Sequence, residues 1–529
     1  MISVLASESD EPVAREFFEL FKTPWQFHVP GRRAEVLLCV GNEGAGEQAD
    51  LKIVYVAAPR RSRERPLWFR NEELEFPVYG AGEASAWGDV FFQRGEQNGA
   101  ACVWIGYDLF AEIRLLLSAG QPPALAAIPT LELHIALLRK LILEHGLALL
   151  EIPPSPADHD FIVCLTHDVD HPAIRNHKFD HTAAGFVYRA TVGSLLDVAR
   201  GLKTVRQMAE NWLAALKLPL VHAGLAGDFW HEFDHYVALE KGRGSTFFVI
   251  PRKGETGLDH NGRRQARRAA SYDARDLRDD LLALGKNGKE VGVHGIDAWR
   301  NAAAGGAEKK VIADLIGAPE LGVRMHWLYF AAQSPLELEN AGFTYDSTMG
   351  YNDTVGYRAG TAQVFKPLAA KQLLELPLHV MDTALFYPSY LHLSAAQADE
   401  ILQPLIENAV AYGGVLTVNW HDRSLAPERL WGDAYARLLD RLQARNPWFA
   451  TAAQCVGWFR RRRAARFETS PETGEVRIQM PEGSDALPPL RIRVFPARKG
   501  GRCVENALPA GGRNGSPAAP AVGETLMPT

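Results

Sequence analysis

The stretch Phe161–His171 (FIVCLTHDVDH) constrains the fold of this chain more than any other. An apolar run leads directly into two carboxylates, Asp168 and Asp170, with His167 and His171 beside them. A short apolar run bounded by polar residues is typical of a strand buried on both faces, as in parallel sheets. Side chains two residues apart on a strand share one side, so both carboxylates leave its carboxyl end together. Active sites of α/β proteins are built at that end.

Taken alone, an Asp-x-Asp pair often only starts a turn or caps a helix. Two further apolar strands end in similar chemistry and favour a site instead: Gly288–His294 delivers His294, and Gly414–Arg423 delivers His421. Other strand-like segments alternate with helical ones over this part of the chain, namely Ser245–Ile250, Gly322–Leu328, Phe343–Ser347 and Leu374–His379. Strands that alternate with helices and end in polar groups predict an α/β barrel.

The length of 529 residues predicts about three domains. Residues 1–155 are interpreted as an α/β accessory domain, bounded by the proline-rich Pro153–Pro156. Residues 156–455 form the predicted barrel, and residues 456–499 are expected to form a helix and short strands. The Gly/Pro/Ala-rich residues 500–529 are predicted to be disordered.

Composition excludes several classes of function. The net charge of −6 gives no basic excess for nucleic-acid binding, and no charge-free apolar run is long enough to span a membrane. Five scattered cysteines and the absence of a positively charged signal segment predict a cytoplasmic location. The basic run Arg460–Arg463 is interpreted as a solvated helix end, with peripheral contact to anionic lipid or polymer as the alternative. Nothing in the sequence indicates the oligomeric state.

The segment His231–His235 (HEFDH) matches the H-E-x-x-H pattern of zinc proteases. That pattern requires an apolar helix that buries the metal, whereas Asp234 places a charge between the two histidines. We therefore interpret this match as accidental.

The strand ends suggest a metal-dependent hydrolysis. Asp170, His294 and a third donor would bind a divalent metal with one position left for water, with zinc favoured and cobalt, iron or nickel as alternatives. Asp168 is placed to accept a proton from that water, and His421 could protonate a leaving amine. Together these are the parts needed for hydrolysis of an amide.

Residues from about 160 to 455 resemble the polysaccharide deacetylase family, also called the NodB-homology or carbohydrate esterase family 4 domain. The segments that carry this resemblance are, in order, Leu165–Asp170, Val291–His294, Arg324–Trp327, Glu375–Pro377 with Asp382, and Trp420–Asp422. The resemblance implies a distorted (β/α)7 barrel with an α/β N-terminal domain and a small C-terminal extension. It also implies that acetyl groups, in particular N-acetyl groups, are removed from a sugar or polysaccharide.

The resemblance further assigns roles to individual residues. It implies that Asp168 is the base, Asp170 a metal ligand and His421 the acid. Arg324 would orient the base, and Asp382 would tune the acid.

The chain departs from the family pattern at two positions. Ala298 stands where a second metal-binding histidine is usual, and His326 replaces a proline of the arginine motif. Either His326 or Asp297 could supply the missing ligand, and we favour His326 because it restores an imidazole.

Two other functional classes remain open. One is a metal-free hydrolase of cyclic imides or ureides. The other is a catalytically silent carbohydrate-binding protein, against which the joint presence of Asp168, Arg324 and His421 argues.

Overall fold

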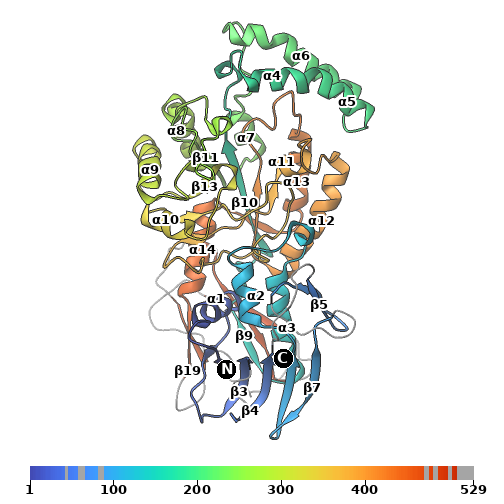
Figure 1. Ribbon diagram of the computed structural model, residues 1–529, viewed down its shortest axis with the longest axis vertical. Coiled ribbons are helices and arrows are strands. Elements are labelled where there is room, and N and C mark those ends of the chain that lie inside the picture. Colours follow the sequence, from blue (N-terminus) through green and yellow to red (C-terminus); the bar gives the residue numbers. More distant parts are fainter. Residues whose placement is uncertain are drawn as a thin grey trace, which may run out of the picture. The chain divides into compact units, whose positions relative to one another are not determined.

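The computed structural model describes residues 1–41, 46–56, 66–80, 89–469, 476–480, 486–497 and 503–508. The chain divides into two compact units (Figure 1). Unit 1 comprises residues 1–159, 359–368 and 457–529, and unit 2 comprises residues 160–358 and 369–456. The chain therefore passes from one unit to the other four times. Most of the predicted tail, residues 509–529, lies outside the described residues.

Unit 2 is built on a sheet of nine parallel strands. Eight of them lie in the order β15-β14-β13-β12-β11-β10-β17-β16, and β18 also pairs with β10. Their bounds are β10 Phe161–Val169, β11 Ser245–Val249, β12 Glu290–Gly295, β13 Val323–Met325, β14 Tyr345–Asp346, β15 Leu374–Glu375, β16 Val380–Met381, β17 Val415–Asn419 and β18 Pro447–Phe449. All nine residues of β10 are buried, as expected for the central strand of a sheet covered on both faces.

The sheet of unit 2 is curled into an incomplete barrel. Its edge strands β15 and β16 are opposite edges of the sheet, yet Glu375 and Val380 are separated by only four residues. Five residue steps span at most about 18 Å, so the two edges must approach each other. The connecting segment forms backbone hydrogen bonds near both edges. The Leu376 amide donates to the Asp346 carbonyl oxygen near one edge, and the His379 amide donates to the Thr417 carbonyl oxygen near the other. The prediction of an α/β fold with a distorted parallel barrel is thus confirmed.

Helices connect and cover these strands. Figure 1 shows α8, α9 and α10 beside β11 and β13, with α12 and α13 on the opposite side of β10. The bounds are α7 Phe233–Leu239, α8 Arg278–Lys286, α9 Ala302–Ile316, α10 Ser334–Asn340, α11 Asp382–Phe386, α12 Ala395–Tyr412 and α13 Gly432–Gln443. Three more helices, α4 (His181–Tyr188), α5 (Ser194–Ala199) and α6 (Val205–His222), lie in the long connection between β10 and β11.

Unit 1 contains a second α/β arrangement, as predicted. Its main sheet has the order β2-β1-β3-β4-β8-β7 and is parallel except for the β7–β8 pair. The strands are β1 Ile2–Leu5, β2 Trp25–Phe27, β3 Ala34–Val40, β4 Ala49–Tyr55, β7 Phe92–Gln97 and β8 Ala100–Ile105, with helices α1 Glu11–Phe21, α2 Leu109–Leu116 and α3 Thr130–Glu144.

Smaller sheets complete the described part of unit 1. A hairpin joins β5 (Leu67–Arg70) to β6 (Glu75–Val78), and another joins β19 (Arg466–Thr469) to β20 (Val476–Gln479). A three-stranded sheet combines β9 (Leu149–Glu151) with β21 (Arg491–Phe495) and β22 (Val504–Ala507). Strand β22 lies inside the segment that was predicted to be disordered.

Most of the basic run at the end of α14 (Ala452–Ala464) does not form the solvated helix end that was predicted. Arg462 is only 1% exposed, and its guanidinium donates to the carbonyl oxygens of Ile152 and Leu20. Arg463 pairs with Glu16 at 2.8 Å. Arg462 and Arg463 thus bind backbone carbonyl groups and a glutamate of unit 1, and the structure does not support contact of these two arginines with lipid or polymer. No helix among the described residues has the length and apolar character needed to cross a membrane.

Candidate metal centre and active site

Neighbouring strands of unit 2 carry the candidate site at their carboxyl ends. Asp168 is the last residue but one of β10, and Asp170 follows that strand directly. His294 near the end of β12 stands in register with Arg324 of β13. His421 comes two residues after β17, which pairs with β10 on its other side. Because these strands are parallel, their carboxyl ends meet at one edge of the sheet and bring these residues together.

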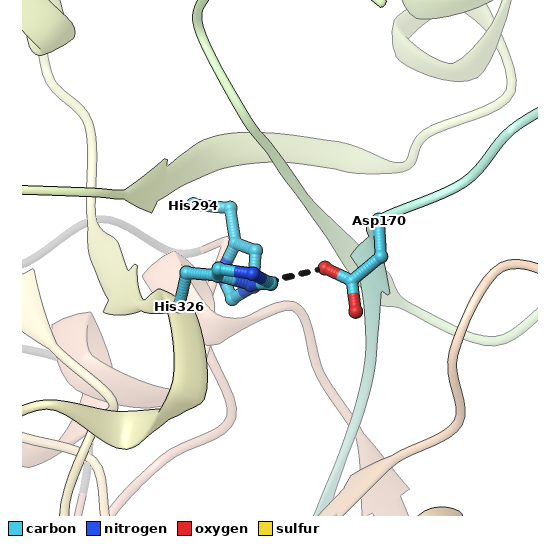
Figure 2. A group of neighbouring side chains, drawn as sticks. All are labelled: Asp170, His294 and His326. Carbon is cyan, nitrogen blue, oxygen red and sulfur yellow. Dashed lines mark hydrogen bonds and ion pairs between the residues drawn. The ribbon is translucent and has the colours of Figure 1, made fainter. Parts of the chain in front are cut away.

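Two of these side chains, Asp170 and His294, converge on one point with His326, which follows β13 directly. Figure 2 shows the rings of His294 and His326 facing the Asp170 carboxylate. Asp170 Oδ1 lies 3.3 Å from His294 Nε2 and 3.2 Å from His326 Nδ1, and the two nitrogens are 3.0 Å apart. All three ligand atoms lie within 4.8 Å of one another. Among the described residues, these three side chains form the group that could hold a metal ion.

The donors of this group fit a divalent cation. Asp170 Oδ1 is buried and has no hydrogen-bond donor among the described residues. The His294 Nδ1 lies 2.9 Å from the carbonyl oxygen of Arg324, which fixes the tautomer that turns the Nε2 lone pair toward Asp170. Burial lowers the pKa of His326 and so favours the neutral ring that a metal requires. Two imidazoles and one carboxylate suit zinc and other first-row divalent metals.

Asp170, His294 and His326 are called the triad below. Asp168 lies beside the triad and is held by other partners. Its Oδ1 accepts from Arg324 Nη1 at 3.1 Å, and its Oδ2 accepts from Asn419 Nδ2 at 2.9 Å. Burial opposes ionisation of Asp168, but the Arg324 guanidinium and two nearby histidines lower its pKa below the ordinary value. Asp168 is therefore a charged carboxylate with both oxygens oriented.

Arg324 is itself fully buried and held at several points. Its Nε donates to the Ser347 carbonyl oxygen at 2.9 Å, and its Nη2 donates to the Ser347 hydroxyl at 2.8 Å. A third bond runs from Nη1 to Thr166 Oγ1 at 2.7 Å. The side chain can thus fix the Asp168 carboxylate without moving itself.

His421 forms a pair with Asp382 at the other side of the site. His421 Nδ1 lies 2.6 Å from Asp382 Oδ1, and the His421 amide donates to Asp382 Oδ2 at 2.7 Å. Burial alone would lower the pKa of His421, but the Asp382 carboxylate, with Asp170 and Asp168 near it, raises the pKa to about 9. The free ring atom, Nε2, lies 3.9 Å from Asp170 Oδ2 and so faces the triad.

The alternative ligand Asp297 is not part of the triad. Its Oδ1 accepts from the Leu258 amide at 3.0 Å, and its own amide donates to the buried Glu308. Ala298 is completely buried. The structure therefore brings His326, and not Asp297, to Asp170 and His294.

The two histidines of the HEFDH segment have separate partners. His231 Nε2 lies 3.2 Å from Asp280, and His235 Nδ1 lies 3.0 Å from Glu232. Their side chains are 41% and 56% exposed, and α7 begins only at Phe233. This arrangement agrees with the interpretation of the match as accidental.

A cavity of about 410 Å³ adjoins the triad. Three aromatic residues line it, of which Trp327 and Tyr390 are exposed and Tyr387 is not. Four arginines also line it: Arg267, Arg268, Arg423 and Arg429. The residue after His326, Trp327, has a φ of 63°, in the left-handed region that costs about 1 kcal/mol or more for a bulky residue. Arg268 donates to the His326 carbonyl oxygen at 3.1 Å and so holds this turn in place.

Some residues of the site carried no clear signal in the sequence. Asn419 and Ser347 hold the base and its arginine, although neither belongs to a motif singled out above. Asn419 lies two residues before His421, at the end of a strand that was already suspected, and this position could have identified it. Ser347 lies 23 residues from Arg324, and only the fold brings the two together.

Neither protein-family models nor curated protein sequences match this chain. Among solved structures it is similar to a proposed polysaccharide deacetylase from Mycobacterium smegmatis, with 17% identity over 58% of this chain and 94% of that one, at a TM-score of 0.37. It is also similar to the PuuE allantoinase (14% identity, 57% and 91% covered, TM-score 0.33). A peptidoglycan N-acetylglucosamine deacetylase gives 12% identity, 57% and 90% coverage and a TM-score of 0.26. At such low scores these similarities carry no argument about activity, and the fold rests on the strand order given above.

Proposed function

We propose that this protein is a metal-dependent hydrolase that removes acetyl groups, in particular N-acetyl groups, from a carbohydrate or polysaccharide precursor. The observation that carries the proposal is the arrangement of two oriented pairs around one triad. Asp168 with Arg324 and His421 with Asp382 flank the group formed by Asp170, His294 and His326.

The triad is the proposed binding site for the metal, with zinc first among the alternatives. When bound there, the metal supplies Lewis acidity and makes a water molecule nucleophilic at neutral pH. All other parts of the chemistry come from side chains of the chain.

Asp168 acts as the general base. Its carboxylate is held by Arg324 and Asn419, so it can accept the proton of the attacking water without rotating. His421 acts as the general acid, because Asp382 fixes its Nδ1 and leaves Nε2 free to protonate the leaving amine. The aromatic side chains of the adjoining cavity supply faces on which a sugar ring can stack.

The experiment is a hydrolysis screen with the full-length protein. The protein is stripped with a chelator, reloaded separately with zinc, cobalt, iron or nickel, and incubated with acetylated monosaccharides, chito-oligosaccharides and nucleotide sugars. Release of acetate that depends on the metal supports the proposal, and Asp168→Asn is the inactive control. Turnover of cyclic ureides by the metal-free protein would instead support the alternative hydrolase, and binding without turnover of any substrate would support a binding protein. A cytoplasmic location remains a prediction from the sequence.

A further inference from the structure

The connection that contains α4, α5 and α6 exposes an unusual number of apolar side chains. Of the twenty large apolar side chains that are exposed among the described residues, twelve lie between residues 179 and 225. They are Phe179, Val187, Tyr188, Val192, Leu195, Leu196, Val205, Trp212, Leu213, Leu216, Leu220 and Leu225. We call this set the apolar outer face. Exposed apolar patches of this kind on soluble domains mark interaction surfaces.

Most residues of the outer face lie on helices whose other side is already packed, and Phe179 and Leu225 flank these helices. Asn211, Ala214, Leu218 and Val221 of α6 are buried, at helical spacing, and the last three belong to a cluster with Phe186 of α4 and Trp230. The helices α4–α6, which together form a helical hairpin, are therefore amphipathic in the folded protein. One side packs against the rest of unit 2, and the other side is exposed. Figure 1 shows α4, α5 and α6 extending away from the helices that cover the sheet of unit 2.

Trp212 is the tryptophan of this face. Its indole Nε1 donates to Ser194 Oγ at 3.1 Å, while 45% of the residue remains exposed. The polar atom of the ring is thus satisfied within the hairpin, and the apolar body faces outward. Tryptophan and leucine on one side of an amphipathic helix are typical of helices that lie in a membrane interface.

The charge of the segment has the opposite sign to that of the chain. Residues 172–230 contain seven lysines and arginines and four acidic residues, whereas the whole chain has a net charge of −6. The acidic side chains are engaged: Asp228 is 4% exposed and accepts from the amides of Ile174 and Arg175, and Asp197 pairs with Lys203. Lys178, Arg200 and Lys217 have no carboxylate within ion-pair distance in the described part of the chain, and they remain available to an anionic surface.

A second cavity lies beside α5 and the turn that joins α5 to α6. It has a volume of about 240 Å³ and is lined by Tyr188 and Leu196 of the outer face together with Arg189, Arg200 and Lys203. Tyr387 and Arg429 line both this cavity and the one that adjoins the triad. The two cavities therefore share part of their walls.

We propose that the apolar outer face of α4–α6 binds the surface of a bilayer that contains anionic lipids. Apolar side chains enter the boundary between headgroups and acyl chains, and the flanking lysines and arginines bind lipid phosphates. A second copy of the chain fits this surface less well, because a symmetric contact would bring the same cationic groups together. The proposal needs neither a bound metal nor turnover, so it stands or falls separately from the proposed function.

The experiment is vesicle flotation of the full-length protein. Vesicles contain phosphatidylcholine alone, or phosphatidylcholine with about 30% phosphatidylglycerol. We expect the protein to float with the anionic vesicles, to bind the neutral vesicles more weakly, and to dissociate from the anionic ones as the salt concentration rises. Vesicle binding that is equal for both compositions would overturn the electrostatic part of the proposal.

Two sets of variants separate the apolar from the cationic contribution. Leu213→Glu with Leu216→Glu should weaken binding by about tenfold or more, because two apolar side chains leave the interface. Arg200→Glu with Lys217→Glu should weaken binding to anionic vesicles only. The matched control is Leu336→Glu with Ile401→Glu, which changes exposed apolar residues on α10 and α12 and should bind as the wild type does.

Circular dichroism and thermal unfolding establish that each variant is folded. Vesicle binding that survives the outer-face substitutions would overturn the proposal. So would a stable dimer that these substitutions dissociate in a protein that binds no vesicles, since the second copy would then be the occupant. Absence of binding to either vesicle, by a monomer, would also overturn it and would point to an acidic protein partner.

Discussion

His167 Nε2 lies 2.8 Å from a carboxylate oxygen of Glu240, and neither side chain has any exposed surface. The other ring nitrogen of His167 lies 2.7 Å from the carbonyl oxygen of Trp420. Lys289 Nζ lies 3.2 Å from the second oxygen of Glu240. His167 precedes the proposed base and Trp420 precedes the proposed acid, so this buried cluster joins the two strands that position them.

Glu240→Gln should destabilise the protein by about 3–5 kcal/mol, because Lys289 and His167 would lose the carboxylate that balances them in a buried site. Urea unfolding at neutral pH measures the loss. Glu400→Gln, an exposed change on α12, is the control and should alter stability by less than about 0.5 kcal/mol. Equal stability of both variants would show that the cluster carries no net charge interaction.

Asp168→Asn should abolish turnover and leave the metal content unchanged. The oxygens of Asp168 are bound by Arg324 and Asn419 and do not belong to the triad, so the base can be lost without the metal. Metal analysis and acetate release are measured on the same preparation, with Asp170→Asn as the variant that should lose the metal. Loss of metal in step with activity would contradict the assignment of Asp168 as the base.

His326→Ala should lower the affinity for the metal strongly, whereas Asp297→Ala should not. His326 Nδ1 lies 3.2 Å from Asp170, but Asp297 is committed to the Leu258 amide. A catalytic metal needs about three protein ligands, so removal of one imidazole leaves a weak site. Metal titrations of both variants decide between them, and a loss confined to Asp297→Ala would reverse the assignment.

His421→Ala should slow turnover by roughly 10²–10⁴-fold, the usual contribution of a general acid. Asp382→Asn should slow it in the same direction, because the ring of His421 loses the partner that fixes its orientation. Both variants should retain the metal. If turnover of a substrate with an activated leaving group fell as much as turnover of the natural amide, His421 would not be the acid.

Glu132→Gln should stabilise the protein at alkaline pH and not at acidic pH. Glu132 of α3 is buried, accepts from Thr361 Oγ1 at 2.6 Å, and has its pKa raised by burial from 4.5 to about 7. Because the pKa of Glu132 is raised in the folded state, its protonation stabilises the protein, and this stabilisation is fully present below pH 4.5. It is lost as the pH rises through 7, and the free energy of unfolding falls by up to about 1.4 kcal/mol per pH unit. Glutamine does not titrate, so urea midpoints of variant and wild type should diverge between pH 4.5 and pH 8. The exposed change Glu8→Gln is the control, and a difference that is the same at both pH values would contradict the prediction.

Much of the fold was predictable because its signals are local. The apolar run of β10 and the residues that follow each strand are readable in sequence order, and parallel strands place such residues at one edge. The proposed ligand His326 could also be suggested, because an imidazole at that position is hard to explain by packing. The cluster of His167, Glu240 and Lys289 could not, since its members lie on separate elements and only the tertiary fold shows that they are buried together.

One surface prediction failed, and one exposed surface was not foreseen, for a related reason. The arginines at the end of α14 have the sequence of a solvated helix end, but carbonyl oxygens from distant segments of unit 1 surround Arg462. In the α4–α6 connection the helical pattern was evident, yet a pattern of apolar residues does not reveal which side of a helix finds a partner. Exposure is a property of the assembled unit and cannot be read from the spacing of residues.

The division of unit 1 into separate segments has a consequence for synthesis of the protein on the ribosome. Strand β9 is made early, but its neighbour β21 is translated only after all of unit 2 has been added to the chain. Unit 2 is complete once residue 456 has left the ribosome, so it can fold before β21 is made. Until then, β9 has an edge that is not paired with β21. A chain terminated before residue 491 would leave that edge permanently open, and an early stop codon should therefore yield an aggregating product rather than a shortened enzyme.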